Sequence, residues 1–364
     1  MTPFAVVIFL LGLSSLATAA NFTQVFEWPN ELDFEWPSEE SRTQALEDGT
    51  FKPVKIQPRY MAVYEARLFL NLFKEDGVPA SLVSLPTSSE SSSPPKLTPF
   101  PSWDFHLNGS GNCDKIHRAE GMEVDSDGRL WVLDQGNPDS NCSSKLWIFN
   151  LINNETELIH RFSFDEYFHD LVLDETANGT FAYIARWMES HVVVFSLERN
   201  ESWIVDTPKV EVNSIALSTK DQEPRHLYLA RSGFKELYSI PVAALHNGNR
   251  TTEPRLIENW AADNSYRMLM DSHGTLYSGF MYENYTSTWN TSRPFLEQSF
   301  YQVAGLESAW PFTFSLDQNA TFWMTVFDDV NMPRFRLLKA AVAAKSYIYN
   351  SPECPGSCHK NDYA

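Results

Sequence analysis

Acidic, basic and aromatic residues recur at matching places in six similar segments of this chain. Each segment contains an apolar run, a turn and a second apolar run. The residues in question stand five positions before the turn or at the end of the second run. A carboxylate can bind an ammonium group, and aromatic rings can stack on a ligand ring. We therefore predict a binding site for a small aromatic ligand, such as an aryl-ethylamine, lined by Tyr60, Glu120, Asp134, Trp187, Asn213, Tyr266, Phe312 and Phe327.

Two structural explanations compete with a ligand site. Aromatic residues in β-sheet proteins mostly fill the space between packed sheets, so any one of these rings could belong to the core. The carboxylates of Glu120 and Asp134 could instead form ion pairs with Arg186 or Arg231. The sequence leaves both explanations open beside the ligand hypothesis.

The segments form a repeat of nearly constant length. With Leu130, Phe181, Leu227, Leu276 and Phe322 as markers, the intervals are 51, 46, 49 and 46 residues. This is the length of a four-stranded propeller blade. Apolar runs on either side of an Asp-, Gly- or Asn-rich turn are typical of the inner hairpin of a blade. The third strands are predicted at residues 146–152, 192–197, 236–242 and 299–305.

An earlier segment, 60–73, has the same pattern without the glycine turn and brings the count to six. We predict an all-β fold, a six-bladed β-propeller in a single domain over residues 21–345, followed by a flexible C-terminal tail at 346–364. Because an open row of blades would leave exposed sheet edges, residues 26–58 should pair with the last strands near Phe335. This geometry brings the predicted ligand residues to one face of the ring, at a place that we call the axial mouth.

The N-terminal residues 1–20 have the features of a secretory signal peptide. The apolar run from Phe4 to Leu13 is too short to span a bilayer, and Ala17-Thr18-Ala19 is a suitable cleavage motif. We expect an extracellular, secreted protein that is not anchored in a membrane. Secretion would allow glycosylation at ten Asn-X-Ser/Thr sequons, which are Asn21, Asn108, Asn141, Asn154, Asn178, Asn200, Asn249, Asn284, Asn290 and Asn319.

The cysteine positions indicate the compartment of the protein, and its net charge limits the kinds of partner that it can bind. Cys113 and Cys142 bracket the second hairpin and are expected to form a disulfide in an oxidising compartment. Cys354 and Cys358 lie in the tail, where either a small disulfide loop or a flexible segment is consistent with their spacing. The formal net charge of −19 argues against nucleic acid and anionic membrane surfaces as partners.

The chain resembles the yellow/major royal jelly protein family of arthropods in several segments. These are FEWPNELDFEWPS from Phe26, RTQALEDGTFKP from Arg42, CDKIHRAEGMEVDSDGRLWVLDQG from Cys113 and GTFAYIAR from Gly179. The resemblance implies a secreted six-bladed propeller, in agreement with the repeat. It also implies one of several roles, because family members act in pigmentation and melanin formation, in binding of biogenic amines, or as nutritive secretions.

Some family members convert dopachrome, which provides a catalytic hypothesis. Tautomerisation of such a quinone needs a base for a carbon-bound proton and a donor or cation near the developing phenolate. His169 is the only histidine at the predicted mouth and is the expected base, with Arg186 or Arg231 as its electrostatic partner. The alternative is a storage or cuticle-matrix glycoprotein without a specific ligand.

Other reaction classes lack their sequence motifs. The mature sequence contains no glycine-rich phosphate loop, no HExxH pair, no Gly-x-Ser-x-Gly elbow and no His/Cys cluster with metal-ligand spacing. We therefore predict neither a cofactor nor a metal.

Overall fold

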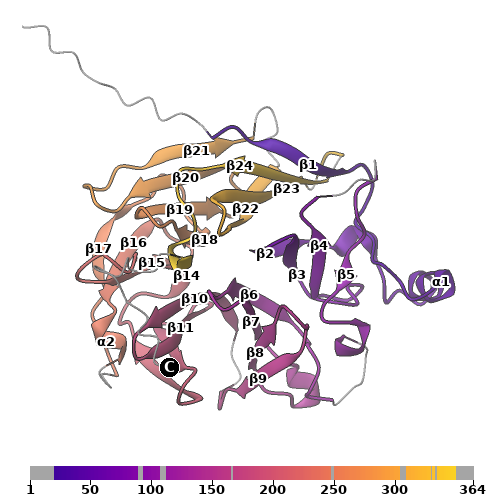
Figure 1. The fold of residues 1–364 in the computed structure, drawn as a ribbon, viewed down its shortest axis with the longest axis horizontal. Coiled ribbons are helices and arrows are strands. Elements are labelled where there is room, and N and C mark those ends of the chain that lie inside the picture. Colours follow the sequence, from indigo (N-terminus) through magenta and orange to yellow (C-terminus); the bar gives the residue numbers. More distant parts are fainter. Residues whose placement is uncertain are drawn as a thin grey trace, which may run out of the picture.

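Six four-stranded antiparallel sheets surround a common centre in a computed structural model of the chain (Figure 1). It describes residues 20–88, 93–106, 112–164, 167–246, 250–303, 309–328, 330–332 and 334–349. The strands labelled β2, β6, β10, β14, β18 and β22 lie nearest the centre of the ring. The prediction of an all-β, six-bladed propeller is confirmed.

The blades follow one another along the chain. Blade 1 contains β2 (Pro58–Tyr64), β3 (Arg67–Leu72), β4 (Leu82–Pro86) and β5 (Thr98–Pro99). Blade 2 contains β6 (Ala119–Val124), β7 (Arg129–Asp134), β8 (Lys145–Asn150) and β9 (Thr156–Arg161). Blade 3 contains β10 (Phe168–Thr176), β11 (Gly179–Arg186), β12 (His191–Ser196) and β13 (Glu201–Asp206). Blade 4 contains β14 (Val212–Leu217), β15 (His226–Arg231), β16 (Glu236–Pro241) and β17 (Arg255–Asn259). Blade 5 contains β18 (Ser265–Met270), β19 (Thr275–Phe280), β20 (Tyr285–Asn290) and β21 (Gln298–Gln302).

Blade 6 closes the ring. It combines β22 (Ala309–Leu316), β23 (Thr321–Asp328) and β24 (Phe335–Ala341) with the N-terminal β1 (Thr23–Trp28). Strand β1 pairs antiparallel with β24, and Trp28 lies opposite Phe335. The predicted closure by the N-terminal segment is confirmed, and it removes the exposed sheet edge that an open array would have.

One strand prediction was wrong. The segment 299–305, expected as the third strand of blade 5, contributes instead to β21, the fourth strand. The third strand is β20, whose sequence YTSTWN lacks an apolar run although Thr286 and Ser287 are buried. Hydroxyl side chains replace aliphatic ones at this place, so hydrophobic periodicity does not identify the strand.

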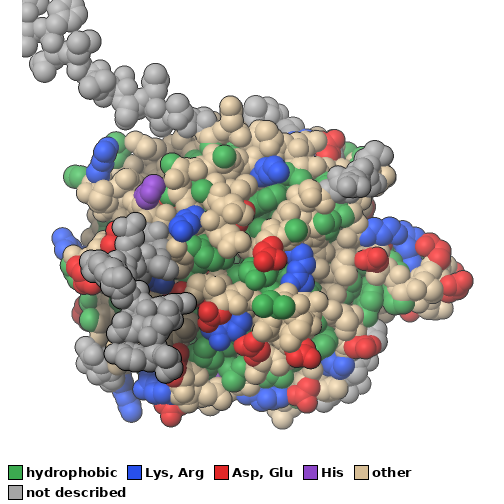
Figure 2. All heavy atoms as spheres, viewed as in Figure 1, with side chains coloured by type: hydrophobic (Ala, Val, Ile, Leu, Met, Phe, Trp, Pro, Cys, Tyr) green, Lys and Arg blue, Asp and Glu red, His purple; other side chains and the backbone are tan. Residues whose placement is uncertain are grey.

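Short helical segments lie outside the sheets. Helix α1 (Glu39–Glu47) projects from the side of blade 1, and acidic side chains gather on it in Figure 2. Its N-cap is Ser38, whose side chain accepts a hydrogen bond from the amide of Ser41. The remaining segments are α2 (Ala243–His246), η1 (Pro53–Lys55), η2 (Trp103–Phe105), η3 (Pro138–Ser140) and η4 (Tyr347–Tyr349).

The turn η4 extends the packed part of the chain past the predicted domain boundary at residue 345. Tyr347 is buried, donates a hydrogen bond to the carbonyl of Leu173 at 2.9 Å and accepts one from its amide at 3.0 Å. Both backbone groups belong to Leu173 on β10, an innermost strand, so the start of the predicted tail packs against the propeller. Residues 350–364, with Cys354 and Cys358, lie outside the described ranges.

The inner hairpin of every blade contains a register shift near the same end. The shifts lie between Pro58 and Tyr60, Ala119 and Met122, Phe168 and Leu171, Val212 and Ile215, Ser265 and Arg267, and Trp310 and Thr313. A bulge of this kind leaves ladder groups unpaired and bends the strand. Side chains of neighbouring blades supply some of the missing partners, so the bulges also join the blades.

Three such contacts show how the blades are joined. The amide of Asn71 donates to the carbonyl of Ala119 at 2.8 Å, from blade 1 to blade 2. The carboxylate of Asp170 accepts from the amide of Ile215 at 3.1 Å, linking blades 3 and 4. Asn213 donates to the carbonyl of Ser265 at 2.7 Å, linking blades 4 and 5. Buried backbone groups near the axis therefore have side-chain partners.

A glycosylated asparagine must be accessible, so the exposure of the sequon asparagines is relevant to the predicted glycosylation. Six sequon asparagines are exposed, and Asn284 and Asn290 are partly buried. The exposed ones are Asn21, Asn141, Asn154, Asn178, Asn200 and Asn319. Asn108, Asn249 and most of the predicted signal peptide, residues 1–19, lie outside the described ranges. Within those ranges, no helix has the length and apolar character needed to cross a bilayer.

Candidate functional site at the axial mouth

The bulges aim consecutive residues of the inner strands toward the axis. In β10, Phe168 pairs with Arg186 and Leu171 pairs with Ile184, so the intervening His169 and Asp170 lie opposite a single residue. A regular strand would place these two side chains on opposite faces of the sheet. The bulge removes this alternation, and both side chains make contacts with residues of other blades.

Rings from four blades meet at the mouth. The hydroxyl of Tyr60 lies 2.7 Å from Nδ1 of His169. The ring centroids of His169 and Tyr266 are 4.6 Å apart, and those of Tyr266 and Phe312 are 4.9 Å apart. The indole of Trp187 lies 5.1 Å from the His169 ring and is 40% exposed, whereas the other four rings are buried. Trp187 therefore stands between this cluster and solvent.

The buried carboxyl group of Glu120 interacts electrostatically with Tyr60 and Tyr266 of the ring cluster. Glu120 accepts a hydrogen bond from Nε2 of Gln135 at 3.1 Å. Burial raises the pKa of Glu120 to about 8, although the charges of Arg118 and Arg59 act in the opposite direction. At neutral pH the side chain is largely protonated, and a small change in its surroundings would ionise it.

His169 is neutral in this environment. Burial, together with the charges of Arg59 and Arg267, lowers the pKa of His169 to about 3, while a hydrogen bond to the backbone of Asn213 acts against this shift. The guanidinium of Arg59 lies 5.6 Å from the Tyr266 centroid and 5.7 Å from the Phe312 centroid. A cation therefore borders the aromatic cluster and could stabilise negative charge on a ligand.

A second polar layer lies next to the rings. Arg267 pairs with Asp170, and its Nη2 atom lies 3.6 Å from the Glu123 carboxylate. The Arg267 guanidinium also lies 5.5 Å from the Tyr60 ring centroid. Burial raises the pKa of Glu123 to about 7, with Arg267 lowering it. This layer supports the rings of the mouth from one side with a buried ionic network.

The structure brings most of the predicted ligand residues together. Tyr60, His169, Trp187, Tyr266 and Phe312 form the ring cluster, and Glu120 and Asn213 lie on the adjoining bulges. The amide of Asn213 donates to Ser265, and its Oδ1 atom has no hydrogen-bond partner among the described residues. That oxygen is itself covered by protein, and Asn213 is 2% exposed.

Four predicted site residues make their contacts away from this cluster. Asp134 pairs with Lys145 at 3.3 Å inside blade 2. Arg186 contacts His191 and the Phe164 ring, and Arg231 pairs with Glu236 at 3.2 Å. Phe327 packs against Trp310 and Phe335 in the core between blades 6 and 1. All four lie on the second strands of their blades, and their side chains pack or form ion pairs within a blade or between neighbouring blades.

The sequence interpretation did not identify Arg59, Asp170 and Arg267. Each directly adjoins a predicted mouth residue: Tyr60, His169 or Tyr266. Strand alternation assigns such neighbours to the opposite face, and only the bulges bring them to the axis. A run of two polar or aromatic residues at the start of an inner strand was the signal available in the sequence.

The fold and the sequence can be compared with known proteins. A proposed gluconolactonase has a TM-score of 0.54 and 11% identity, covering 90% of this chain and 94% of that one. A luciferin-regenerating enzyme has a TM-score of 0.51 and 10% identity, with coverage of 83% and 95%. At these identities the likeness concerns the fold alone.

The sequence profile of the major royal jelly protein family matches residues 119–325. This chain belongs to that family. Protein yellow of Drosophila guanche is 26% identical over 376 residues, covering 90% of this chain and 65% of the relative. Protein yellow of Drosophila melanogaster is 24% identical over 396 residues, covering 94% and 72%. The chain thus spans about two thirds of the length of these yellow proteins.

A third relative carries the name of an activity. Dopaminechrome tautomerase of Drosophila melanogaster is 29% identical over 208 residues, which cover 52% of this chain and 44% of the relative. The family resemblance predicted from the motifs is confirmed by these comparisons.

Proposed function

We propose that this family member is a secreted glycoprotein whose axial mouth binds a small catechol- or indole-derived aromatic molecule, in pigmentation or amine handling. The observation that carries the proposal is the convergence of five rings from four blades beside Glu120 and Arg59. Rings provide stacking surfaces, and an ionisable carboxyl group with a nearby cation provides polar orientation.

An amine ligand would use the carboxyl group of the mouth. Its ammonium group would ionise Glu120, because a nearby positive charge lowers a carboxyl pKa that burial had raised. The aromatic part of the ligand would stack on Trp187, whose exposed indole borders the cluster.

Calorimetry against dopamine, serotonin, histamine and a stable dopachrome analogue tests this proposal. Trp187→Ala should weaken binding about tenfold, the equivalent of one lost stacking contact. Phe234→Ala is the matched control, since Phe234 is 46% exposed in the corresponding loop of blade 4. Absence of binding across the panel would refute the proposal and favour a storage or matrix protein without a specific ligand.

Proton transfer on a dopamine-derived quinone is a second candidate, favoured by the acid–base state of Glu120. A group with a pKa of about 8 can exchange a proton near neutral pH, whereas neutral His169, with its pKa of about 3, is a weak base. In this reaction the ionised form of Glu120 would take the carbon-bound proton and return a proton to the quinone oxygen. Arg59 would stabilise the developing phenolate, and His169 with Tyr60 would orient the ring. The likeness to a dopaminechrome tautomerase supports this candidate.

The consumption of dopaminechrome, followed by its absorbance, separates binding from turnover. Glu120→Gln should abolish turnover while it preserves binding of the dopachrome analogue. His169→Gln should reduce turnover less, because the glutamine amide can still hydrogen-bond to Tyr60. A wild-type protein that binds the analogue without consuming dopaminechrome would exclude the enzymatic candidate and leave the binding proposal intact.

A further inference from the structure

A polar cleft of about 1010 Å³ lies beside the axial mouth, between blades 1 and 2. Its walls are residues 48–52 after α1, the loop 74–79 between β3 and β4, residues 115–118 before β6, and the loop 136–140 between β7 and β8. Arg118 connects the two places, because it lines the cleft and its charge lowers the pKa of Glu120 at the mouth. The cleft is nevertheless built from residues other than the ring cluster.

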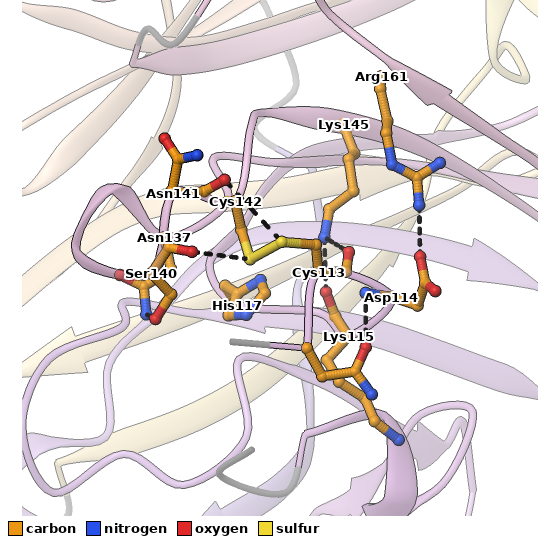
Figure 3. Close-up of a disulfide and its surroundings, with 12 residues drawn as sticks. Cys113, Asp114, Lys115, His117, Asn137, Ser140, Asn141, Cys142, Lys145 and Arg161 are labelled. Atoms are coloured by element: carbon orange, nitrogen blue, oxygen red, sulfur yellow. Dashed lines mark hydrogen bonds and ion pairs between the residues drawn. A yellow bond between two sulfur atoms is a disulfide. The ribbon is translucent and has the colours of Figure 1, made fainter. Parts of the chain in front are cut away.

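The cleft is held in shape from behind. The Cys113–Cys142 disulfide ties the segment before β6 to the loop after β7 (Figure 3). The Asp134 carboxylate accepts hydrogen bonds at 2.9 Å from the amides of Arg118 and Gly136, one on each wall. Lys145 donates to the carbonyls of Cys113 and Lys115, both at 2.7 Å. A wall fixed in this way loses little conformational freedom when a ligand binds.

Three side chains of the cleft each contain a buried polar atom without a hydrogen-bond partner among the described residues. His106 is only 6% exposed, and its Nε2 donates to the carbonyl of Phe100 at 2.9 Å. Burial lowers the pKa of His106 to about 4, so Nδ1 carries a lone pair, and this atom has no partner among the described residues. Nδ1 of His117 and the Nε–H donor of Arg118 likewise have no partner among the described residues. These atoms are covered by the protein itself, so a ligand in the cleft would meet the accessible parts of His117 and Arg118, whose side chains are only partly buried.

The lining combines donors and acceptors without an excess of either charge. Cationic and acidic side chains occur in equal numbers, together with an amide and two hydroxyl groups. One exposed aromatic ring, that of Tyr167, stands among them. The charged residues are Lys52, Lys74, Lys115, Arg118, Asp48, Glu75, Asp76 and Asp139, and the neutral ones are Asn137, Thr50 and Ser140.

Such a lining matches the chemistry of sugars. Each sugar hydroxyl both donates and accepts, so it can satisfy mixed partners, and the apolar face of a pyranose ring can cover an aromatic side chain. An anionic ligand would meet the acidic side chains of the cleft and a chain of formal net charge −19. We propose that the cleft between blades 1 and 2 binds an oligosaccharide, with Tyr167 as the stacking platform and the partly buried His117 and Arg118 as hydrogen-bonding partners.

Calorimetry of the full secreted chain with four tetrasaccharides tests the proposal: cellotetraose, maltotetraose, tetra-N-acetylchitotetraose and a hyaluronan tetrasaccharide. At least one should bind, and Tyr167→Ala should weaken that binding about tenfold. Tyr282→Ala is the matched control, because Tyr167 is 64% exposed and Tyr282 is 62% exposed on blade 5, away from the cleft. Arg118→Gln should also weaken binding, whereas Arg161→Gln, on β9 outside the cleft, should not.

Three results would overturn the proposal. The first is the absence of binding of every tetrasaccharide at a concentration of about 5 mM, because a weaker dissociation constant would not indicate a specific site. The second is an equal loss of binding in Tyr167→Ala and Tyr282→Ala. The third is binding of inorganic sulfate, lost in Arg118→Gln, without binding of any sugar, which would make the cleft an anion site. Trp187→Ala should leave oligosaccharide binding unchanged, so failure at the axial mouth and failure at the cleft are distinguishable.

Discussion

Replacing Lys145 with Met should strongly destabilise the protein, although Lys145 lies outside the ring cluster of the mouth. The ammonium group and the Asp134 carboxylate are both fully buried and lie 3.3 Å apart. Removing one partner of a buried ion pair costs about 3–5 kcal/mol, because the other charge remains buried without compensation. Asp134 would keep its bonds from the amides of Arg118 and Gly136 and from the Trp147 indole, so we expect about 3 kcal/mol.

Unfolding in guanidinium, followed by tryptophan fluorescence, measures this loss. By thermal unfolding, about 3 kcal/mol corresponds to a decrease in melting temperature of about 4 °C for a domain of this size. Lys220→Met is the control, since Lys220 pairs with Glu175 at 3.1 Å in a partly exposed place and should cost less than about 1 kcal/mol. In the double variant Lys145→Met/Asp134→Asn, the total loss should be smaller than the sum of the single losses.

The effect should also depend on pH. Burial alone would raise the pKa of Asp134, but Lys145 and the surrounding amides lower it below its ordinary value. A lowered carboxyl pKa stabilises the folded state above the unfolded pKa, and this contribution is lost as the pH falls through the folded pKa. The difference between wild type and Lys145→Met should therefore shrink below about pH 4. A cost similar to that of Lys220→Met at neutral pH, or a difference independent of pH, would refute the reasoning.

Three further predictions concern the mouth and the disulfide. Because the pKa of Glu120 is raised in the folded state, the stability of the wild type should fall as the pH rises from 4.5 through about 8. The melting temperature of Glu120→Gln should depend less on pH, and parallel curves for the two proteins would contradict this prediction. In Gly121→Ala, the new Cβ would lie 2.7 Å from the carbonyl oxygen of His169, so we expect a loss of about 1–3 kcal/mol and weaker ligand binding, and an unchanged melting temperature would contradict the close approach. Cys113→Ser/Cys142→Ser opens a link with a sequence separation of 29 residues and should cost about 2–4 kcal/mol in chemical unfolding, a loss that reductant should reproduce in the wild type.

Much of the architecture could be predicted from the sequence because it depends on local periodicity. Apolar runs around turns repeat at intervals of 46 to 51 residues, and each repeat can bury its apolar surface only against the next blade. The same periodicity correctly placed Tyr60, His169, Tyr266 and Phe312 at one end of the inner strands. Strand β20 was missed because its buried residues are mostly hydroxylic.

The direction and partners of the side chains near the axis were decided by the tertiary structure. Alternation along a regular strand cannot predict that His169 and Asp170 both contact other blades, because the bulge depends on the register of the pairing strand. Asp134 stands in the sequence beside predicted mouth residues, yet Lys145 and the amides of residues 117, 118 and 136 hold it inside blade 2. The sequence alone therefore determined the blades, their closure and the end of the strands where a site could lie. Which charged groups reach that site was decided only by packing, because a buried charge is stable only where the folded chain supplies its partners.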